Sequence, residues 1–160
     1  MSWIVKSSII SFGHDIEGSW LLTEAAEALG NEKLLKEIKN VAIKLVDRTI
    51  MEGTDKSSSL FYEYDKKTGK IDFDKHWWCQ AEAMIGLVKA WQITGNQQYM
   101  KNAANIWDYI TKFIINVEYG EWNAVIDKFN HVITKGDRVG FWKCPYHNTR
   151  ACIEVINRLV

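Results

Sequence analysis

Two Gly-Asn pairs divide much of this chain into segments whose apolar residues recur at helical spacing. Gly30-Asn31 and Gly95-Asn96 each follow one periodic segment and precede another. A glycine commonly ends a helix, and asparagine favours the start of the next one. The shift of 65 residues between the pairs predicts a repeated helix–turn–helix unit, that is, stacked αα-hairpins. The four helices expected on this basis span residues 15–29, 32–51, 75–94 and 97–116.

The remaining sequence predicts one more helix and two short hairpins. Pro145, the single proline, precedes a periodic segment that runs to the last residue, and so we expect a helix there. Residues 60–64 and 71–73 flank a polar turn, and a second hairpin is expected over residues 121–134. No linker or low-complexity segment interrupts the chain. We therefore expect an all-α fold, an αα-hairpin array with short β-hairpins in its loops, as a single domain over residues 1–160.

Alternate helices of stacked αα-hairpins run parallel, so the first, third and fifth helices should begin at one end. The most unusual segments of the sequence lie at these three starts: FGHDIEGSW, DKHWWCQAEA and FWKCPYHNTRA. We expect them to converge on one rim of the array and to form a site there.

Charge and composition exclude several classes of function. Lys+Arg and Asp+Glu both count 20, so no basic field is present to attract nucleic acid or a membrane surface. No apolar stretch approaches the ~20 residues of a membrane span, and the N-terminus lacks a signal-peptide pattern. The three cysteines, Cys79, Cys144 and Cys152, lack the spacing of a disulfide framework or zinc ribbon. We expect reduced thiols and a cytoplasmic location.

Two histidines near predicted helix starts, His14 and His147, are the candidate acid/base groups. The positive end of the helix dipole disfavours the imidazolium, so each ring is expected to be neutral and able to accept a proton. Glu17 lies three residues after His14, on the same helix face, and could hold its ring or bind a sugar hydroxyl. The alternative is that His14 and Asp15 simply cap a helix.

Trp77, Trp78 and Trp142 are candidate platforms for a sugar, because an indole face stacks on a pyranose and its N–H can donate a hydrogen bond. For any one of them, packing in the core is the alternative. A metal site is not expected, since neither H-E-x-x-H nor paired cysteines are present. Nucleotide-binding glycine motifs are also absent from the sequence. A Cys144–His147 nucleophile pair is conceivable, but no third group is evident to orient it.

The same three segments resemble the motifs of cellobiose 2-epimerases, within the N-acylglucosamine 2-epimerase superfamily. The segment from Ser11 to Trp20 is similar to their central motif, and Trp77 to Ala83 is similar to their W-W-x-Q-A-E segment. Residues 141–151 resemble their C-terminal motif. The resemblance implies that this chain forms the C-terminal part of an (α/α)6 barrel.

By this resemblance the protein is an isomerase that inverts C2 of a reducing-end glucose through an enediol, without a cofactor. The resemblance implies that His14 and His147 act as acid and base across C2, with Glu17 paired to the first. It also implies that the cleft residues Trp77, Trp78, Trp142 and Glu82 bind a disaccharide or monosaccharide substrate.

The family's N-terminal half, with further cleft residues, is not part of this sequence. We therefore expect weak or no activity from these 160 residues alone, or association with themselves or with the missing half. Two alternatives stay open: a non-catalytic carbohydrate-binding or assembly half of a split or degenerate epimerase, and a monosaccharide epimerase or aldose–ketose isomerase.

Overall fold

The computed structural model describes residues 7–134 and 138–160, which form an array of helices with short antiparallel strands in its loops. The helices are α1 (Phe12–Leu29), α2 (Glu32–Gly53), α3 (Trp77–Thr94), α4 (Gln97–Tyr109), which continues into the π-helix η1 (Ile110–Ile114), and α5 (Tyr146–Leu159). The strands are β1 (Ile9–Ser11), β2 (Glu63–Asp65), β3 (Lys70–Asp72), β4 (Lys75–His76) and β5 (Val125–Ile126). The predicted αα-hairpin array is thereby confirmed.

Both Gly-Asn pairs act as the sequence predicts. Gly30 and Gly95 end α1 and α3 in the left-handed conformation, with φ of 67° and 72°. The side chain of Asn31 then accepts a hydrogen bond from the Leu34 amide at the start of α2. Asn96 caps α4 in the same way. These turns fold α1 against α2 and α3 against α4.

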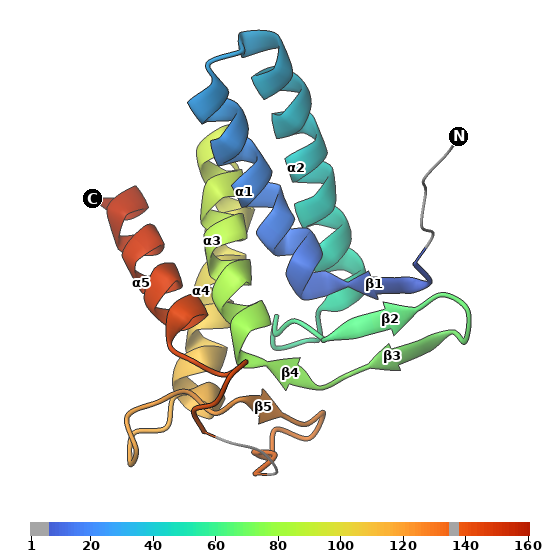
Figure 1. Cartoon of the computed structure of the whole chain (residues 1–160), viewed down its shortest axis with the longest axis vertical. Helices are drawn as coiled ribbons and strands as arrows, with labels where there is room; N and C mark the ends of the chain where they lie inside the picture. The colour runs from blue at the N-terminus through green and yellow to red at the C-terminus, as the bar shows by residue number, and fades with distance from the viewer. Residues whose placement is uncertain (1–6, 135–137) are drawn as a thin grey trace.

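The helices α1, α3 and α5 start at the same end of the array, at the bottom of the view in Figure 1. The three-stranded sheet β1-β2-β3 and the two-stranded sheet β4-β5 lie at this end as well. The polar loops and the first turns of three helices are thus brought together. The turns that join α1 to α2 and α3 to α4 lie at the opposite end.

Helix α3 lies at the centre and contacts α1, α2, α4 and α5. It is buried on nearly every side from Trp77 to Ala90, as expected for a helix that is apolar all round. Its polar residues are paired: Gln80 exchanges two hydrogen bonds of 2.7 Å with the backbone of Leu60, and Lys89 binds Glu27 at 2.8 Å. Helix α3 thus forms the centre of the hydrophobic core.

Several expected boundaries differ from the structure. Helix α1 begins at Phe12 rather than at residue 15, and α3 begins at Trp77 because Lys75 and His76 pair as β4 with β5. The expected hairpin over 121–134 is therefore only partly formed: Ile126 bridges Val132, but both residues of β5 also pair with β4.

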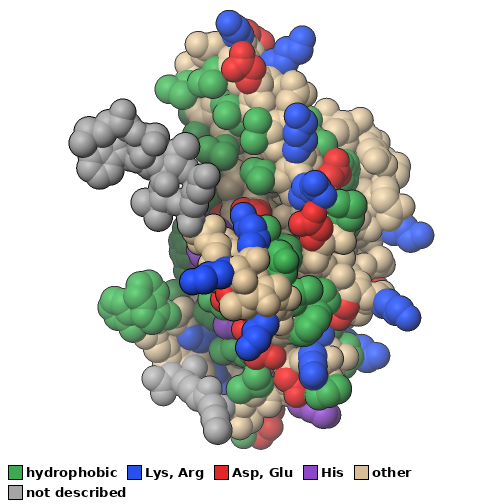
Figure 2. All heavy atoms as spheres, turned by 90° about the vertical axis from the view of Figure 1, so that its right-hand side faces the viewer, with side chains coloured by type: hydrophobic (Ala, Val, Ile, Leu, Met, Phe, Trp, Pro, Cys, Tyr) green, Lys and Arg blue, Asp and Glu red, His purple; other side chains and the backbone are tan. Residues whose placement is uncertain are grey.

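Acidic and basic side chains are interspersed on the face that carries α2 and the larger sheet (Figure 2), as the balanced charge of the sequence indicates. Within the described residues, none of the helices combines the length and apolar character that a bilayer crossing requires.

A test of the core concerns Gly86, where α3 packs closely against α1. A Cβ at this position would lie 2.7 Å from Cγ1 of Ile16 and 3.1 Å from its carbonyl oxygen. We expect Gly86→Ala to lower the free energy of unfolding by about 1–3 kcal/mol, because the two helices must separate. Urea unfolding followed by circular dichroism measures the change.

The matched control is Gly18→Ala on α1, where a Cβ would meet no atom within 4 Å. This change should stabilise the protein by up to about 1 kcal/mol, since alanine favours the helix. Equal effects of the two substitutions would contradict the close approach of α1 and α3.

Candidate active site

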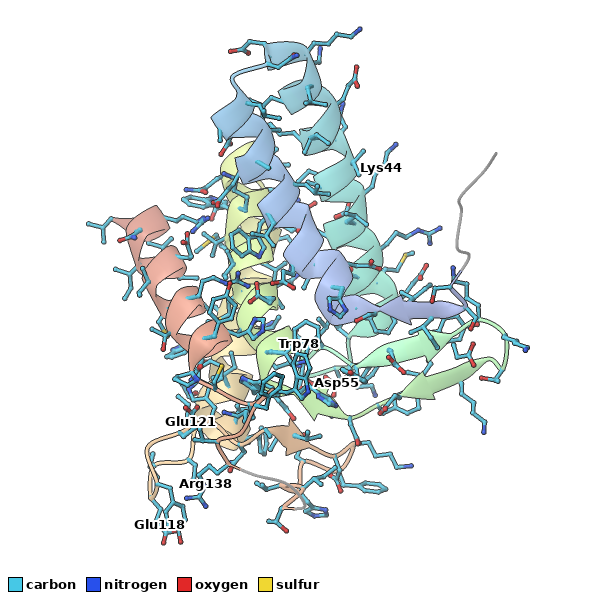
Figure 3. All side chains as sticks on the ribbon, viewed as in Figure 1. Lys44, Asp55, Trp78, Glu118, Glu121 and Arg138 are labelled. Carbon is cyan, nitrogen blue, oxygen red and sulfur yellow. The ribbon has the colours of Figure 1, made fainter. Side chains whose placement is uncertain are left out.

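A cleft of about 520 Å³ opens at the end of the array where α1, α3 and α5 begin. Its volume lies within the usual range for a small-molecule site. Figure 3 shows Trp78 in this region, near the start of α3. The residues that line the cleft are His14, Glu17, Tyr62, His76, Trp77, Trp78, Val125, Trp142, Lys143 and His147.

His147, in the first turn of α5, is held by a buried carboxylate. Its Nδ1 lies 2.6 Å from Oε1 of Glu82, whose side chain is fully buried on α3. The other Glu82 oxygen, Oε2, accepts a hydrogen bond of 3.0 Å from the indole N–H of Trp20. Because an ionised carboxylate can only accept, Nδ1 of His147 must donate, and in the neutral ring this leaves Nε2 with a free lone pair. His147 is thus arranged to accept a proton at Nε2.

His14, in the first turn of α1, also lies close to Trp78. The ring centroids of His14 and Trp78 are 4.9 Å apart, and those of His147 and Trp78 are 5.6 Å apart. The Nδ1 atom of His14 is 2.8 Å from the hydroxyl oxygen of Ser11. The two predicted acid/base histidines therefore lie near one tryptophan in one cleft, although 133 residues separate them.

Glu17 does not hold His14, which was one of its two expected roles. Its Oε1 instead lies 2.6 Å from Nη2 of Arg150 on α5. The same Nη2 atom is 2.6 Å from Oε1 of Glu82. Arg150 also donates to the Tyr146 hydroxyl at 2.6 Å. Burial disfavours the charge of this guanidinium, but the bonds to Glu82 and Glu17 outweigh that effect and raise the pKa of Arg150.

Glu82 also differs from its expected role as a substrate-binding group. It is fully buried and does not line the cleft, and three donors on α1 and α5 occupy its oxygens. Its position therefore supports a role in orienting His147.

The three tryptophans of the predicted sugar platform all line the cleft but differ in exposure. Trp77 is largely buried and belongs to the hydrophobic core, although its indole N–H has no hydrogen-bond partner among the described residues. Trp78 is half-buried and lies close to both histidines. Trp142 is 85% exposed and packs edge-on against Phe141. The cleft therefore offers aromatic surface of the kind that binds sugar rings.

The far wall of the cleft is a stacked pair, Tyr62 and His76, with ring centroids 3.8 Å apart. Burial lowers the pKa of His76 to about 4, with a smaller opposing effect from Asp72. A neutral His76 is therefore expected near pH 7, with one ring nitrogen able to accept and the other able to donate.

The loop before α5 is fixed by a buried ion pair. Nζ of Lys143 lies 3.1 Å from Oε1 of Glu121, and Nδ2 of Asn148 donates to the same oxygen at 3.0 Å. Glu121 thus binds both Lys143 in the loop and Asn148 in the first turn of α5, and these contacts help to position His147.

Ligand atoms of Glu17, Glu82 and His147 lie within 4.8 Å of one another, as a metal site would require. The guanidinium of Arg150 already supplies the positive charge there and is hydrogen-bonded to both carboxylates. We therefore assign this cluster to Arg150 and not to a metal ion.

The alternatives for His14 and Cys144 receive no support from the geometry. The residue that caps α1 is Ser11, and His14 lies inside the helix. Cys144 does not line the cleft, and the Nδ1 atom of its neighbour His147 is bonded to Glu82.

Arg150, Tyr62, His76 and Lys143 were not predicted as site residues. Arg150 follows His147 by three positions on α5, just as Glu17 follows His14 on α1, so helical spacing could have found it. Nothing in the sequence indicates that residues 62 and 76 stack.

Comparison with known proteins agrees with the cleft and the fold. Residues 4–151 match the model of the N-acylglucosamine 2-epimerase family. The chain belongs to this family. It is 38% identical over 154 residues to the cellobiose 2-epimerase of Bacteroides fragilis, a match that covers 96% of this chain and 39% of that protein. The corresponding protein of Ruminococcus albus is 39% identical over 152 residues, covering 94% of this chain and 38% of that protein.

Solved structures of the N-acylglucosamine 2-epimerase family show the same arrangement. A sugar epimerase from a ruminal bacterium superposes with a TM-score of 0.92 at 34% identity, over 98% of this chain and 40% of that one. The cellobiose 2-epimerase of Bacillus thermoamylovorans gives 0.88 at 37% identity, over 98% and 39%. The expected fold, the C-terminal part of an (α/α)6-barrel epimerase, is confirmed, and the chain spans about two fifths of the length of these relatives.

The depressed pKa of His76 predicts a pH effect on the stability of this epimerase-family chain. Between about pH 6.5 and pH 4, His76 binds a proton in the unfolded chain but stays neutral in the folded chain. The contribution of His76 to the free energy of unfolding is therefore complete above pH 6.5 and is lost as the pH falls toward 4. This lowers the free energy of unfolding by an amount on the order of 2–3 kcal/mol.

Chemical unfolding of the wild-type protein and of His76→Phe at pH 7 and pH 4.5 measures this effect. Phenylalanine keeps a ring against Tyr62 but cannot titrate. We expect the wild-type protein to lose more stability than the variant on acidification. An equal loss in both proteins would show that His76 is not held neutral by burial.

Proposed function

We propose that this segment supplies the acid/base pair of a sugar 2-epimerase that inverts C2 of a reducing-end glucose. The observation that carries the proposal is that His14 and His147 line one cleft and both lie close to the Trp78 ring. Two imidazoles on opposite sides of a bound sugar can remove a proton from one face of a carbon and return one to the other.

The reaction proceeds on the open-chain aldehyde form of the sugar. One neutral imidazole takes the C2 proton, the C–H electron pair forms a C1–C2 double bond, and the carbonyl oxygen receives the negative charge. The second histidine, protonated, then gives its proton to the opposite face of C2 while the carbonyl re-forms. Because epimerisation is reversible, each histidine serves as acid in one direction and as base in the other.

The aromatic and polar side chains that line the cleft suit a carbohydrate. Trp78 and Trp142 provide ring faces on which a sugar can stack. His76 and Tyr62 add polar groups on the far wall. The names of the relatives, cellobiose 2-epimerases, favour a disaccharide with a reducing-end glucose as the substrate.

An aldose–ketose isomerase is the second candidate, since an enediol can also be reprotonated at C1. The D-mannose isomerase of Marinomonas mediterranea is 27% identical to this chain over 104 residues. Product analysis separates the two functions, because an epimerase gives a mannose unit and an isomerase gives a ketose.

We also infer that this segment is completed by the part of an epimerase that it does not span. Helices α1 and α3 are each covered by the helix that follows, whereas no second helix covers α5 within the described residues. An apolar groove of about 370 Å³ lies open between α3, α4 and α5. Ile153, Ile156 and Leu159 on α5 are 51–60% exposed. A helix with an apolar face fits this groove.

Isotope exchange tests the proposed chemistry. The segment is joined to the part of the Bacteroides fragilis enzyme that it does not match, and cellobiose is incubated with the chimera in D₂O. We expect deuterium at C2 by NMR, and a loss of roughly 100-fold or more in the exchange rate for His14→Asn or His147→Asn. The matched control is His131→Asn, because His131 is exposed, bonds to Asp127 and does not line the cleft.

Exchange at the unsubstituted rate in both His14→Asn and His147→Asn would reject the acid/base assignment. Sugar binding without exchange in the chimera itself would instead support the non-catalytic, carbohydrate-binding alternative.

A second test concerns the groove. Light scattering after gel filtration should show a complex between the 160-residue chain and the unmatched part of the Bacteroides fragilis enzyme. We expect Ile156→Glu to weaken this complex at least about tenfold, because a charge would be buried in an apolar interface. Val117→Glu, at a loop position that is 92% exposed, should have no effect. Equal binding by both variants would contradict the inference.

A further inference from the structure

Two carboxylates and one guanidinium form a compact charged cluster behind His147. The Nη2 atom of Arg150 lies 2.6 Å from Oε1 of Glu17 and 2.6 Å from Oε1 of Glu82. Glu82 is fully buried, and the side chains of Glu17 and Arg150 are each 17% exposed. In a site that is largely buried from solvent, two carboxylates bound to the same guanidinium nitrogen stay ionised together only because a positive charge lies between them.

The charge balance of the cluster bears directly on the histidine. With Arg150 present, the two carboxylates and the guanidinium carry a net charge of −1, and His147 adds none while its ring is neutral. Without Arg150 the same place carries −2, which favours uptake of a proton. The nearest group that can take it is the imidazole of His147, whose Nδ1 is already 2.6 Å from Glu82.

We propose that Arg150 is a positioning residue that keeps His147 unprotonated and its Nε2 free. Its positive charge offsets the negative charge of Glu17 and Glu82, which would otherwise favour protonation of the imidazole. The inference rests on the proposed function, which gives His147 its task as a base.

The other charged and titratable groups around His147 do not take this role. On α1, the Nδ1 atom of His14 is 2.8 Å from the hydroxyl oxygen of Ser11. Lys143 in the preceding loop is committed to Glu121 at 3.1 Å.

The remaining neighbours of His147 are neutral groups. The Tyr146 ring lies 5.0 Å from His147, and its hydroxyl accepts from Arg150. His76, on the far wall of the cleft, has a lowered pKa because it is buried. On α3, Cys79 is fully buried, which raises the pKa of its thiol. Arg150 is thus the cation that contacts both carboxylates in the described part of the chain.

The experiment is an NMR titration of the His147 ring in the 160-residue chain, without substrate. We expect the midpoint to rise by about one pH unit or more in Arg150→Met, because a positive charge within hydrogen-bond distance of the partner carboxylate is lost. Arg150→Lys, which keeps the charge but loses the planar geometry, should give an intermediate midpoint.

The decisive variant is the double substitution Arg150→Met with Glu17→Gln, which removes one charge of each sign. We expect its midpoint to return to within about 0.3 pH unit of wild type, a small fraction of the change expected from the lost charge. A purely structural role for Arg150 would not be repaired by a second substitution in the same cluster.

An unchanged midpoint in Arg150→Met, or a failure of the double variant to restore it, would overturn the proposal. If Arg150→Met does not fold, Glu17→Gln alone decides, because removal of one negative charge should lower the midpoint. Absence of C2 exchange in the chimera with the expected titration would reject the epimerase function while leaving the role of Arg150 on the ring intact.

Discussion

The buried carboxylate of Glu82 joins three helices that are far apart in the sequence. Its oxygens accept hydrogen bonds from Trp20 on α1 and from His147 and Arg150 on α5, while Glu82 itself stands in the central helix α3. A buried charge is tolerated only when it is paired and fully hydrogen-bonded. The contacts that satisfy Glu82 are the same contacts that set the position of α5 and the orientation of the His147 ring.

The fold explains why this cluster lies beside a cleft. Stacked αα-hairpins bring the first turns of α1, α3 and α5 to one end, and the close packing of α1 on α3 brings His14 near Trp78. Gly13 contributes here, because a Cβ on it would lie 2.5 Å from the Trp78 ring. The absence of a side chain lets the start of α1 lie against the indole, with His14 on the rim.

Much of this arrangement could be predicted from the sequence. The Gly-Asn pairs predict the helical hairpins, and the alternation of helix direction predicts that three helices start at one rim. The histidines near these helix starts indicate the candidate acid/base pair. The partners of the side chains could not be predicted, because they depend on how helices pack. Glu17 was expected to pair with the nearby His14, but it pairs with Arg150, which is 133 residues away. Glu82 was expected in the cleft, but packing buries it behind the cleft.

If Glu82 fixes the tautomer of His147, the positions of the protons on that ring show it most directly. Long-range ¹H–¹⁵N correlation spectra of the labelled chain, recorded above neutral pH, report which ring nitrogen carries the proton. We expect Nδ1 to be protonated and Nε2 to carry no proton, and we expect Glu82→Gln to weaken this preference. A proton on Nε2 in the wild-type chain would contradict it.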